Sequence, residues 1–348
     1  MNGTAAPLVS VIIPCRNEEN YIRKVIENLL HQDFPKEQME IIFLDGRSTD
    51  RTREIIQEYA GSSGNIRLLD NAAGVVPHAL NEGIRNSTGE VIIRMDAHSD
   101  YPVDYISQLV FHLQHLNADN VGGMWITMPG ADTVTAKAIA VALAHPFGIG
   151  NARYRLGANE PIEVDTVPFG CYRIDVFGRI GLFDEQLIRN QDDEFNARLK
   201  KAGGRIFLIP SVKILYYARP TLTKLSKMYY QYGLFKPLVN IKLGAPATVR
   251  QLVPPLFVFA VFLLAIASVL SGSALILFAL LIGTYLFFDF CFSFLLAFRS
   301  QFRFLLLLPI VFPVIHFSYG TGYLSGLIKY TILGKQHSTD PVHFDISR

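Results

Sequence analysis

Residues 7 to about 215 alternate between short apolar runs and segments with helical spacing. Leu8–Ile13 is a β-branched run that ends at Pro14, which predicts a buried strand. The same pattern predicts further strands at Glu40–Leu44, Ile66–Leu69 and Gly89–Met95, and helices at Asn17–Leu30, Asp50–Tyr59 and Val76–Asn86. Regular alternation of strands and helices implies an α/β fold with a mostly parallel, doubly wound sheet.

Beyond about Val249 the pattern changes to long apolar stretches. They cover Leu252–Leu270, Ala274–Ala297 and Phe304–Ile328. Each reaches roughly the 20 residues that cross the hydrocarbon core of a bilayer. The third stretch contains two prolines, His316 and several glycines, so it is either a kinked span or a re-entrant element packed against protein.

The segment before these stretches mixes basic and aromatic residues. Leu222–Leu243 contains four lysines and four aromatic residues between Tyr229 and Phe235. This composition is typical of an amphipathic helix at a membrane surface, although an ordinary solvated helix would also fit. We therefore expect a cytoplasmic α/β domain at 1–218, an interfacial region at 219–248, a transmembrane domain of about three helices at 249–330, and a tail at 331–348.

The positive charges predict the orientation in the membrane. Lysines and Arg250 precede the first apolar stretch, and Arg299 and Arg303 lie between the second and the third. Because basic loops stay inside, we expect the N-terminal domain in the cytoplasm. Met1–Pro7 has no basic n-region, so no signal peptide is expected there.

Composition narrows the function classes. Half of the residues are hydrophobic and the mean hydropathy is +0.26, which again indicates membrane segments. The net charge of +2 leaves no global basic field, so nucleic acid is not an expected partner. The three cysteines are far apart and odd in number, which indicates neither a disulfide framework nor a zinc site.

Three polar clusters directly follow predicted strands. They are Pro14–Glu18, Asp45–Asp50 and Asp96–His98. Ligands of open α/β sheets bind at the carboxyl ends of the strands, so we expect the clusters to line one edge. Helix capping by Asn17 and a turn at Asp45–Asp50 are structural alternatives for the first two.

The third cluster carries metal-binding chemistry. Asp96 and His98 are two positions apart at a strand end and can face one ion. Their oxygen and nitrogen ligands suit Mn²⁺, and Asp96 alone suits Mg²⁺. The ion would neutralise a diphosphate. A turn with a surface histidine is the structural alternative.

The ordered set of motifs resembles a known enzyme family. Ser10-Val-Ile-Ile-Pro14-x-x-Asn17-Glu18, Asp45-x-x-Ser48-x-Asp50 and Asp96-x-His98 are similar to the family 2 glycosyltransferases with a GT-A fold. The Asp-Ala-His motif, Phe147–Arg155 and Tyr319–Gly322 resemble the branch of ExoA-like proteins of succinoglycan biosynthesis.

The resemblance implies roles on the donor side. It places Pro14, Arg16, Asn17 and Glu18 at the nucleotide, together with Asp45, which would bind the uracil. In the same way it puts Asp96 at the nucleotide diphosphate. Asp96 and His98 would stand at the family's Asp-x-Asp metal motif, with His in place of the second Asp.

The resemblance also implies an acceptor side. Gly170–Arg173 and Gly181–Glu185 are similar to the family's acceptor segment. Asp192 aligns with the catalytic aspartate, Asp193 is its rival by one position, and Gln191 replaces the usual Glu. A carboxylate here can take the proton of an attacking hydroxyl, and three adjacent acids can raise one pKa. The alternative is a charged first turn of a helix at Asp193–Lys201.

Other basic and histidine side chains are candidates for the acceptor. Arg153 and Arg155 follow a glycine-rich turn and could clamp a diphosphate, or belong to a surface loop. His145 could belong to the same loop. His316 lies in a predicted span, where either a functional group or a helix-packing hydrogen bond is expected.

Together these features predict a metal-dependent, inverting hexosyltransferase. It would move a hexose from a UDP-sugar to a polyprenyl-diphosphate-linked saccharide in exopolysaccharide assembly, as a multi-pass protein of the inner (plasma) membrane. The resemblance to the ExoA-like branch implies UDP-glucose as the donor. A polyprenyl-phosphate sugar synthase and a non-catalytic nucleotide-sugar-binding scaffold are the alternatives. A processive synthase is disfavoured because Gln231–Phe235 lacks the Arg and Trp of a Gln-x-x-Arg-Trp motif. Whether the chain forms a homo-oligomer stays open.

Overall fold

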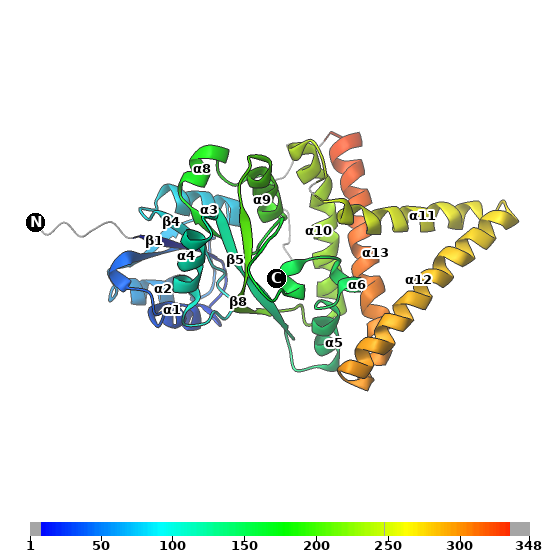
Figure 1. The fold of residues 1–348 in the computed structure, drawn as a ribbon, viewed down its shortest axis with the longest axis horizontal. Coiled ribbons are helices and arrows are strands. Elements are labelled where there is room, and N and C mark those ends of the chain that lie inside the picture. Colours follow the sequence, from blue (N-terminus) through cyan, green and yellow to red (C-terminus); the bar gives the residue numbers. More distant parts are fainter. Residues whose placement is uncertain (1–7, 247, 335–348) are drawn as a thin grey trace, which may run out of the picture. The chain divides into compact units, whose positions relative to one another are not determined.

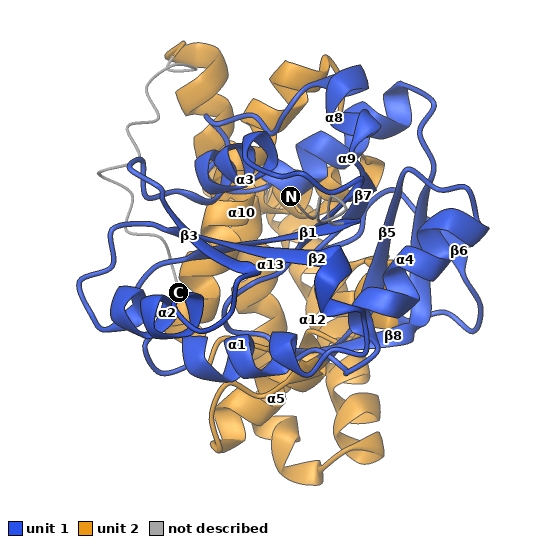
Figure 2. Ribbon diagram, turned by 90° about the vertical axis from the view of Figure 1, so that its left-hand side faces the viewer, with its two compact units in different colours: residues 1–126, 157–216, 340–343 blue, residues 127–156, 217–339, 344–348 orange. Residues whose placement is uncertain are grey.

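The computed structural model describes residues 8–246 and 248–334. Met1–Pro7, where no signal peptide is expected, and most of the tail at 331–348 lie outside the described residues. Two compact units divide the described chain (Figure 2). Unit 1 comprises 8–126 and 157–216, and unit 2 comprises 127–156, 217–246 and 248–334. The segment 127–156 thus interrupts unit 1 in the sequence.

Unit 1 is built on one eight-stranded sheet, in the order β3-β2-β1-β4-β7-β5-β8-β6. Figure 1 labels its strands β1, β4, β5 and β8. Its strands are β1 (Val9–Cys15), β2 (Met39–Asp45), β3 (Ile66–Asp70), β4 (Val91–Arg94), β5 (Asn120–Met128), β6 (Ile162–Glu163), β7 (Cys171–Arg173) and β8 (Ile206–Tyr217). Its helices are α1 (Ile22–Leu30), α2 (Thr52–Ala60), α3 (Val76–Arg85), α4 (Tyr105–His115), α8 (Asp175–Ile180) and α9 (Gln191–Lys201), with a 3₁₀ turn at Lys36–Gln38.

The first four strands are parallel, and β7 runs antiparallel between β4 and β5. The predicted α/β class is therefore confirmed, with a mixed sheet. The predicted strands and helices up to Met95 are each present within a few residues of their expected bounds, except at one helix start. Parallel strands buried on both faces read as continuous apolar runs, which is why this part of the chain is predictable.

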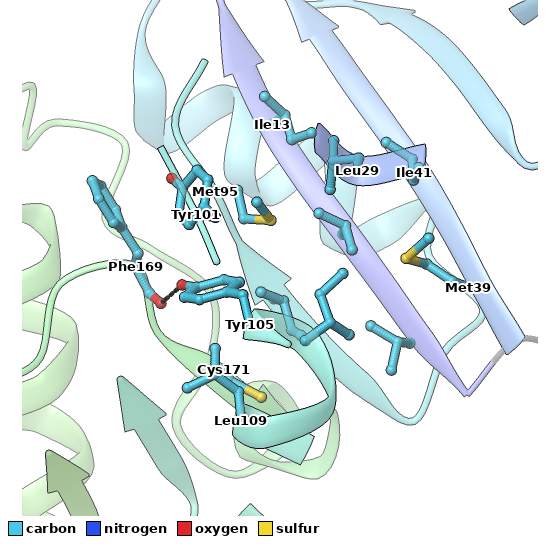
Figure 3. Packing of buried hydrophobic residues seen from close by; sticks show 14 of the residues in the cluster. Ile13, Leu29, Met39, Ile41, Met95, Tyr101, Tyr105, Leu109, Phe169 and Cys171 are labelled. Carbon is cyan, nitrogen blue, oxygen red and sulfur yellow. Dashed lines mark hydrogen bonds between the residues drawn. The ribbon is translucent and has the colours of Figure 1, made fainter. Parts of the chain in front are cut away.

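Alternate side chains of the strands enter different layers of the core. Val11, Ile13 and Ile41 belong to a buried cluster that also takes in the apolar faces of α1, α2 and α4 (Figure 3). Ile12 faces the other way and meets α3, where a Cβ on Gly83 would lie 2.5 Å from its side chain. In Figure 3 the Tyr105 hydroxyl donates a hydrogen bond of 3.3 Å to the Phe169 carbonyl. Both faces of the sheet are thus covered.

The start of the first helix differs from the prediction. Helix α1 begins at Ile22 rather than Asn17, and Asn17 has a left-handed φ of 55°. Its side-chain Oδ1 accepts a hydrogen bond of 2.8 Å from the backbone N–H of Thr49. Asn17 therefore joins two loops instead of capping a helix, because the contact with the loop after β2 competes with the local cap.

A buried polar network closes the amino-terminal edge of the sheet. Glu40 of β2 is 7% exposed and accepts hydrogen bonds from the Ser10 hydroxyl at 2.6 Å and the Thr88 N–H at 2.6 Å. Its other oxygen lies 3.2 Å from Nη1 of Arg67. Burial alone would raise the pKa of the Glu40 carboxyl, but these donors outweigh it and hold the pKa below its usual value.

We expect Glu40→Gln to lower the free energy of unfolding by about 1–3 kcal/mol, because the donors lose a charged acceptor. The folded-state pKa lies below the unfolded value of 4.5, so this contribution is present above pH 4.5 and is lost as the pH falls through the folded-state pKa. Thermal unfolding of the two proteins from pH 7 to pH 3 measures this. The exposed Glu37→Gln is the control, and an equal gap between Glu40→Gln and the parent protein at all pH values would contradict the prediction.

Unit 2 is helical. Its elements are α5 (Val134–Ala142), α6 (Pro146–Ile149), α7 (Arg153–Leu156), α10 (Leu222–Leu243), α11 (Val253–Ala267), α12 (Gly272–Arg299) and α13 (Leu308–Leu327), with short helical turns at Val249–Leu252, Phe302–Leu306 and Ile328–Ile332. Helix α10 has the bounds that the sequence predicts for the interfacial segment. Its position at a membrane surface stays a prediction.

Glycines bring α10 and α13 into backbone contact. A Cβ on Gly233 of α10 would lie 2.1 Å from the Tyr319 carbonyl oxygen. On α13, a Cβ on Gly322 would lie 2.2 Å from the Tyr230 oxygen and one on Gly326 would lie 2.3 Å from the Leu234 oxygen. Spacing of small residues by four positions lets helix backbones approach closely, so these glycines are required by packing.

Two helical segments are long and apolar enough to cross a membrane. They are Val249–Ala267 and Gly272–Arg299, and in their most apolar windows only 22% and 6% of the residues are buried. A core helix of a soluble protein would be mostly buried, so this exposure is compatible with a membrane location. Helix α13, in the third predicted stretch, is not among the segments with this character in the described chain. Its buried face instead packs against α10 and α5.

Gly326→Ala is expected to destabilise unit 2 by about 1–3 kcal/mol, because the new methyl group overlaps a backbone carbonyl. Gly283→Ala on α12 is the matched control, since its Cβ would meet nothing within 4 Å. The midpoint of thermal unfolding in detergent compares them. Equal midpoints for the two variants would show that the helix crossing tolerates a side chain.

Candidate active site

Two loops at the carboxyl-end edge of the sheet are bound to each other. Strand β1 lies between β2 and β4, and in the parallel register Cys15 is opposite Asp45. In the loop after β1, the N–H of Asn17 donates to the Ser48 hydroxyl at 2.9 Å, and the N–H of Glu18 donates to the Thr52 hydroxyl at 2.7 Å. The expected convergence of the first two clusters at one edge is therefore present.

Asp50 joins two segments at this edge. Its Oδ1 accepts from the N–H of Thr52 at 3.0 Å, and its Oδ2 accepts from the N–H of Glu19 at 3.1 Å. It therefore connects the start of α2 with the loop after β1.

Asp45 lies deep at this edge. It is 2% exposed, and its two oxygens accept from the N–H of Ser48 at 3.3 and 3.4 Å. Nη1 of Arg53 lies 3.4 Å from Asp45 and 2.5 Å from Asp70. The neighbouring Arg16 and Asn17 are exposed, and Pro14 is half-buried. A buried carboxylate next to exposed polar groups can accept hydrogen bonds from a ligand that binds over these groups.

The third cluster adds a carboxylate and an imidazole. Nδ1 of His98 lies 3.3 Å from Oε1 of Glu18, which is 6% exposed. The side chain of His98 is 40% exposed and that of Asp96 is 23% exposed. Among the described residues, no group of three or more His, Cys, Asp or Glu side chains could hold a metal ion. Asp96 and His98 thus supply two ligands at most.

Asp192 enters the same edge from α9. The residue before the helix, Asn190, has a left-handed φ of 61°, which asparagine tolerates better than most residues. The turn directs Asp192 to the end of β4, where Nη1 of Arg94 donates to both carboxylate oxygens. Nη2 of the same guanidinium donates to Oδ1 of Asp96 at 3.1 Å. One cation therefore joins two carboxylates that the sequence singles out as candidate site residues.

Burial and charge oppose each other in this group. Burial raises the pKa of the Asp192 carboxyl above its usual value, although Arg94 pulls it down. Burial would lower the pKa of Arg94, but the charges of Asp192 and Asp96 raise it, so that the guanidinium stays charged. A carboxyl with a raised pKa is better matched to accepting a proton near neutral pH.

The other acids of the first turn of α9 have different surroundings. Glu194 is 4% exposed and pairs with Arg198 at 2.8 Å, and Arg198 also donates to the carbonyl of Leu182 at 2.9 Å. Gln191 is buried and Asp193 is half-buried. The helix begins at Gln191 rather than at the predicted Asp193. Of the three adjacent acids, Glu194 is therefore held in an ion pair with Arg198 that stabilises the structure.

The predicted basic clamp lies in unit 2. Arg153 is exposed, and Nη1 of Arg155 donates to the Thr127 hydroxyl at 3.3 Å. Nearby in the same unit, Nη1 of Arg250 donates to the Asn151 carbonyl at 2.7 Å. This bond ties the glycine-rich turn to the residues directly before α11.

The two histidines of unit 2 make packing contacts. Nδ1 of His145 accepts from the N–H of Phe147 at 3.2 Å and caps α6. His316 lies with Nε2 2.7 Å from the Phe147 carbonyl and Nδ1 2.9 Å from the Tyr285 hydroxyl. Both ring nitrogens of His316 are therefore used to join elements, which favours the packing interpretation.

Comparison with known proteins decides the family. Residues 10–181 match the family model described as Glycosyl transferase family 2. The chain is 31% identical over 331 residues to dolichyl N-acetyl-alpha-D-glucosaminyl phosphate 3-beta-D-2,3-diacetamido-2,3-dideoxy-beta-D-glucuronosyltransferase of Methanococcus voltae, covering 92% of this chain and 97% of the relative. This chain belongs to glycosyltransferase family 2. It is also 32% identical over 267 residues to succinoglycan biosynthesis protein ExoA of Rhizobium meliloti, covering 76% and 77%.

A solved structure supports the same fold. The mannosyltransferase PcManGT of Pyrobaculum calidifontis, determined with GDP-Man and Mn²⁺, superposes with a TM-score of 0.57 at 19% identity. The match covers 94% of this chain and 87% of that one. At this identity the likeness shows the GT-A fold alone. The predicted family and fold class are confirmed, whereas Asp192 lies beyond the matched residues 10–181.

Sequence reasoning missed Arg94 as a site residue. The signal was present, because Arg94 interrupts the apolar run Val91–Ile93 in a predicted buried strand. A buried charge requires an ionic partner. The pattern could have shown that a partner exists, but not that Asp192, 98 positions away, supplies it.

Proposed function

We propose that this chain is an inverting glycosyltransferase that moves a hexose from a UDP-sugar to a lipid-linked saccharide. The observation that carries the proposal is the placement of Asp96 and Asp192 on one guanidinium at the carboxyl-end edge of the sheet. Membership of family 2 supports sugar transfer, and the two apolar helical segments support an acceptor in the membrane.

The donor would bind over the loops after β1 and β2. Pro14, Arg16, Asn17 and Glu18 would line the nucleotide site, with Asp45 binding the uracil. The burial of Asp45 and the exposure of its neighbours support this assignment. Glucose as the sugar is what the resemblance of the Asp-Ala-His motif to the ExoA-like branch implies.

Asp96 and His98 would hold Mn²⁺ or Mg²⁺, which when bound neutralises the charge of the diphosphate. A donor set of two protein ligands fits an ion that takes its other ligands from phosphate and water. Glu18 would accept the Nδ1 proton of His98 and so orient the ring with the Nε2 lone pair toward the ion. In this arrangement Glu18 would act at the nucleotide site through His98.

Asp192 would act as the base. The acceptor hydroxyl oxygen forms a bond to the anomeric carbon as the bond from that carbon to the diphosphate breaks, and the hydroxyl proton passes to Asp192. Attack opposite the leaving group inverts the anomeric centre. Gln191 and Asp193 flank Asp192 in the first turn of α9 and would contact the acceptor.

The acceptor would be a saccharide on a polyprenyl diphosphate, in exopolysaccharide assembly at the inner membrane. The Methanococcus voltae relative is named for transfer to a dolichyl-phosphate-linked sugar, which supports a lipid phosphate carrier. Arg153 and Arg155 would bind its phosphates. Arg250 keeps their turn next to the start of α11.

With UDP-glucose, Mn²⁺ and a lipid-linked acceptor extract, we expect UDP release that requires both metal and lipid. Asp192→Asn is expected to lower kcat by about 100-fold or more, because it removes the base. It should leave UDP affinity within about threefold, since kcat and binding report separate interactions. Turnover that survives in Asp192→Asn would favour a polyprenyl-phosphate synthase, whose acceptor is already anionic. UDP binding without turnover of any UDP-sugar would leave only a scaffold.

We expect His98→Ala and Asp96→Asn to weaken Mn²⁺-dependent UDP binding by at least about tenfold. Titration calorimetry with and without Mn²⁺ measures this, because metal-free binding of UDP should change little. His31→Ala is the control, since His31 is exposed and bonds to the Glu27 carbonyl within its own helix. Equal losses with and without Mn²⁺ would argue against a metal at Asp96 and His98.

A further inference from the structure

Arg94 is an unusual group for its position. It belongs to β4, at the centre of the sheet, and its side chain is 8% exposed. Its guanidinium lies 5.6 Å from the centroid of the Phe169 ring, and its Nε is buried without a hydrogen-bond partner. Burying a cation costs several kcal/mol unless carboxylates surround it. The Phe169 ring lies beside the guanidinium, and Asp96 and Asp192 supply the carboxylates that it requires.

The partners of Arg94 are more exposed than Arg94 itself. The side chain of Asp192 is 26% exposed and that of Asp96 is 23% exposed. Because Nη1 and Nη2 lie in one rigid plane, a guanidinium that holds both carboxylates also sets their mutual arrangement. A single ammonium could not do this.

Arg94 sets the direction of the Asp192 side chain, whereas other contacts hold the helix α9 itself. Arg198 lies one turn after Glu194 in α9. It pairs with Glu194 and donates to the Leu182 carbonyl, and these contacts anchor the helix. In the described chain, Arg94 is the group that binds the Asp192 carboxylate. The left-handed Asn190 precedes the helix, and its side chain makes no capping hydrogen bond.

We propose that Arg94 is a positioning residue that holds the acceptor-side Asp192 in register with the donor-side Asp96. The inference rests on the proposed function, in which Asp192 takes the acceptor proton. Through Arg94, the carboxylate that would accept the proton is fixed relative to the diphosphate side of the reaction. In this role Arg94 binds neither substrate itself and acts through the direction of the Asp192 carboxylate, with Asp96 as the fixed reference.

Arg94→Lys tests this role, because it keeps the charge and loses the planar fork. We expect kcat to fall by about 100-fold, the loss that a displacement of about 1 Å can cause. The KM for the nucleotide sugar and the dissociation constant of UDP with Mn²⁺ should stay within about threefold. A purely structural role would instead weaken UDP binding together with kcat.

A double-mutant cycle with Asp192→Asn identifies the residue through which Arg94 acts. In the Asp192→Asn background, Arg94→Lys is expected to lower kcat by less than about threefold, because the group that it positions is already gone. Two losses that multiply would show that Arg94 acts independently of Asp192 and would overturn the inference.

Arg67→Lys is the matched control. Arg67 also pairs its guanidinium with a buried carboxylate of the same sheet, that of Glu40, but at the amino-terminal edge. We expect it to leave kcat unchanged. If Arg94→Lys does not bind UDP, Arg94→Gln is the second variant, with the same expected split between kcat and UDP affinity.

The outcomes separate the two proposals. Undiminished kcat in Arg94→Lys, with the wild-type protein active, overturns the role of Arg94 and leaves the proposed function intact. Loss of UDP affinity in both Arg94 variants likewise overturns it in favour of a structural role. A wild-type protein that binds UDP and transfers no sugar overturns the proposed function, and the role of Arg94 with it.

Discussion

Strand β1 lies between β2 and β4, and all three run in the same direction, so their carboxyl ends meet at one edge. Polar segments that are distant in the sequence therefore converge, and the hydrogen bonds of Asn17 and Glu18 to the loop after β2 join them. Apolar packing on both faces of the sheet keeps this register. The candidate active site depends on that constraint, because the register brings the loops after β1 and β2 within hydrogen-bond distance of each other.

The two edges of the same sheet use buried charge differently. At the amino-terminal edge, Glu40 is surrounded by the donors that it needs and closes the structure. At the carboxyl-terminal edge, Arg94 is buried while Asp96 and Asp192 reach the surface. In the first arrangement, the buried carboxylate makes its hydrogen bonds to groups of the protein itself. In the second, carboxylates are held beside solvent, which is the arrangement expected where ligands exchange.

Unit 2 follows other packing rules. The close approach of α10 and α13 depends on glycines whose added Cβ would meet carbonyl oxygens, and large side chains of both helices are buried in one cluster beside this contact. Helices α11 and α12 instead expose leucine and phenylalanine along most of their length. Such surfaces are stable where lipid replaces water, which accords with their length and apolar composition.

The sequence by itself determined the α/β class, the elements up to Met95, the family and the apolar segments, because each is a local pattern of spacing and composition. It also placed Asp96 and Asp192 in candidate roles through a resemblance. Only the tertiary structure decided that Asn17 joins two loops, that Glu194 is held by Arg198, and that Arg94 binds both Asp96 and Asp192. These are contacts between residues up to 98 positions apart. No local pattern encodes them, since the packing of the whole sheet selects which charge meets which.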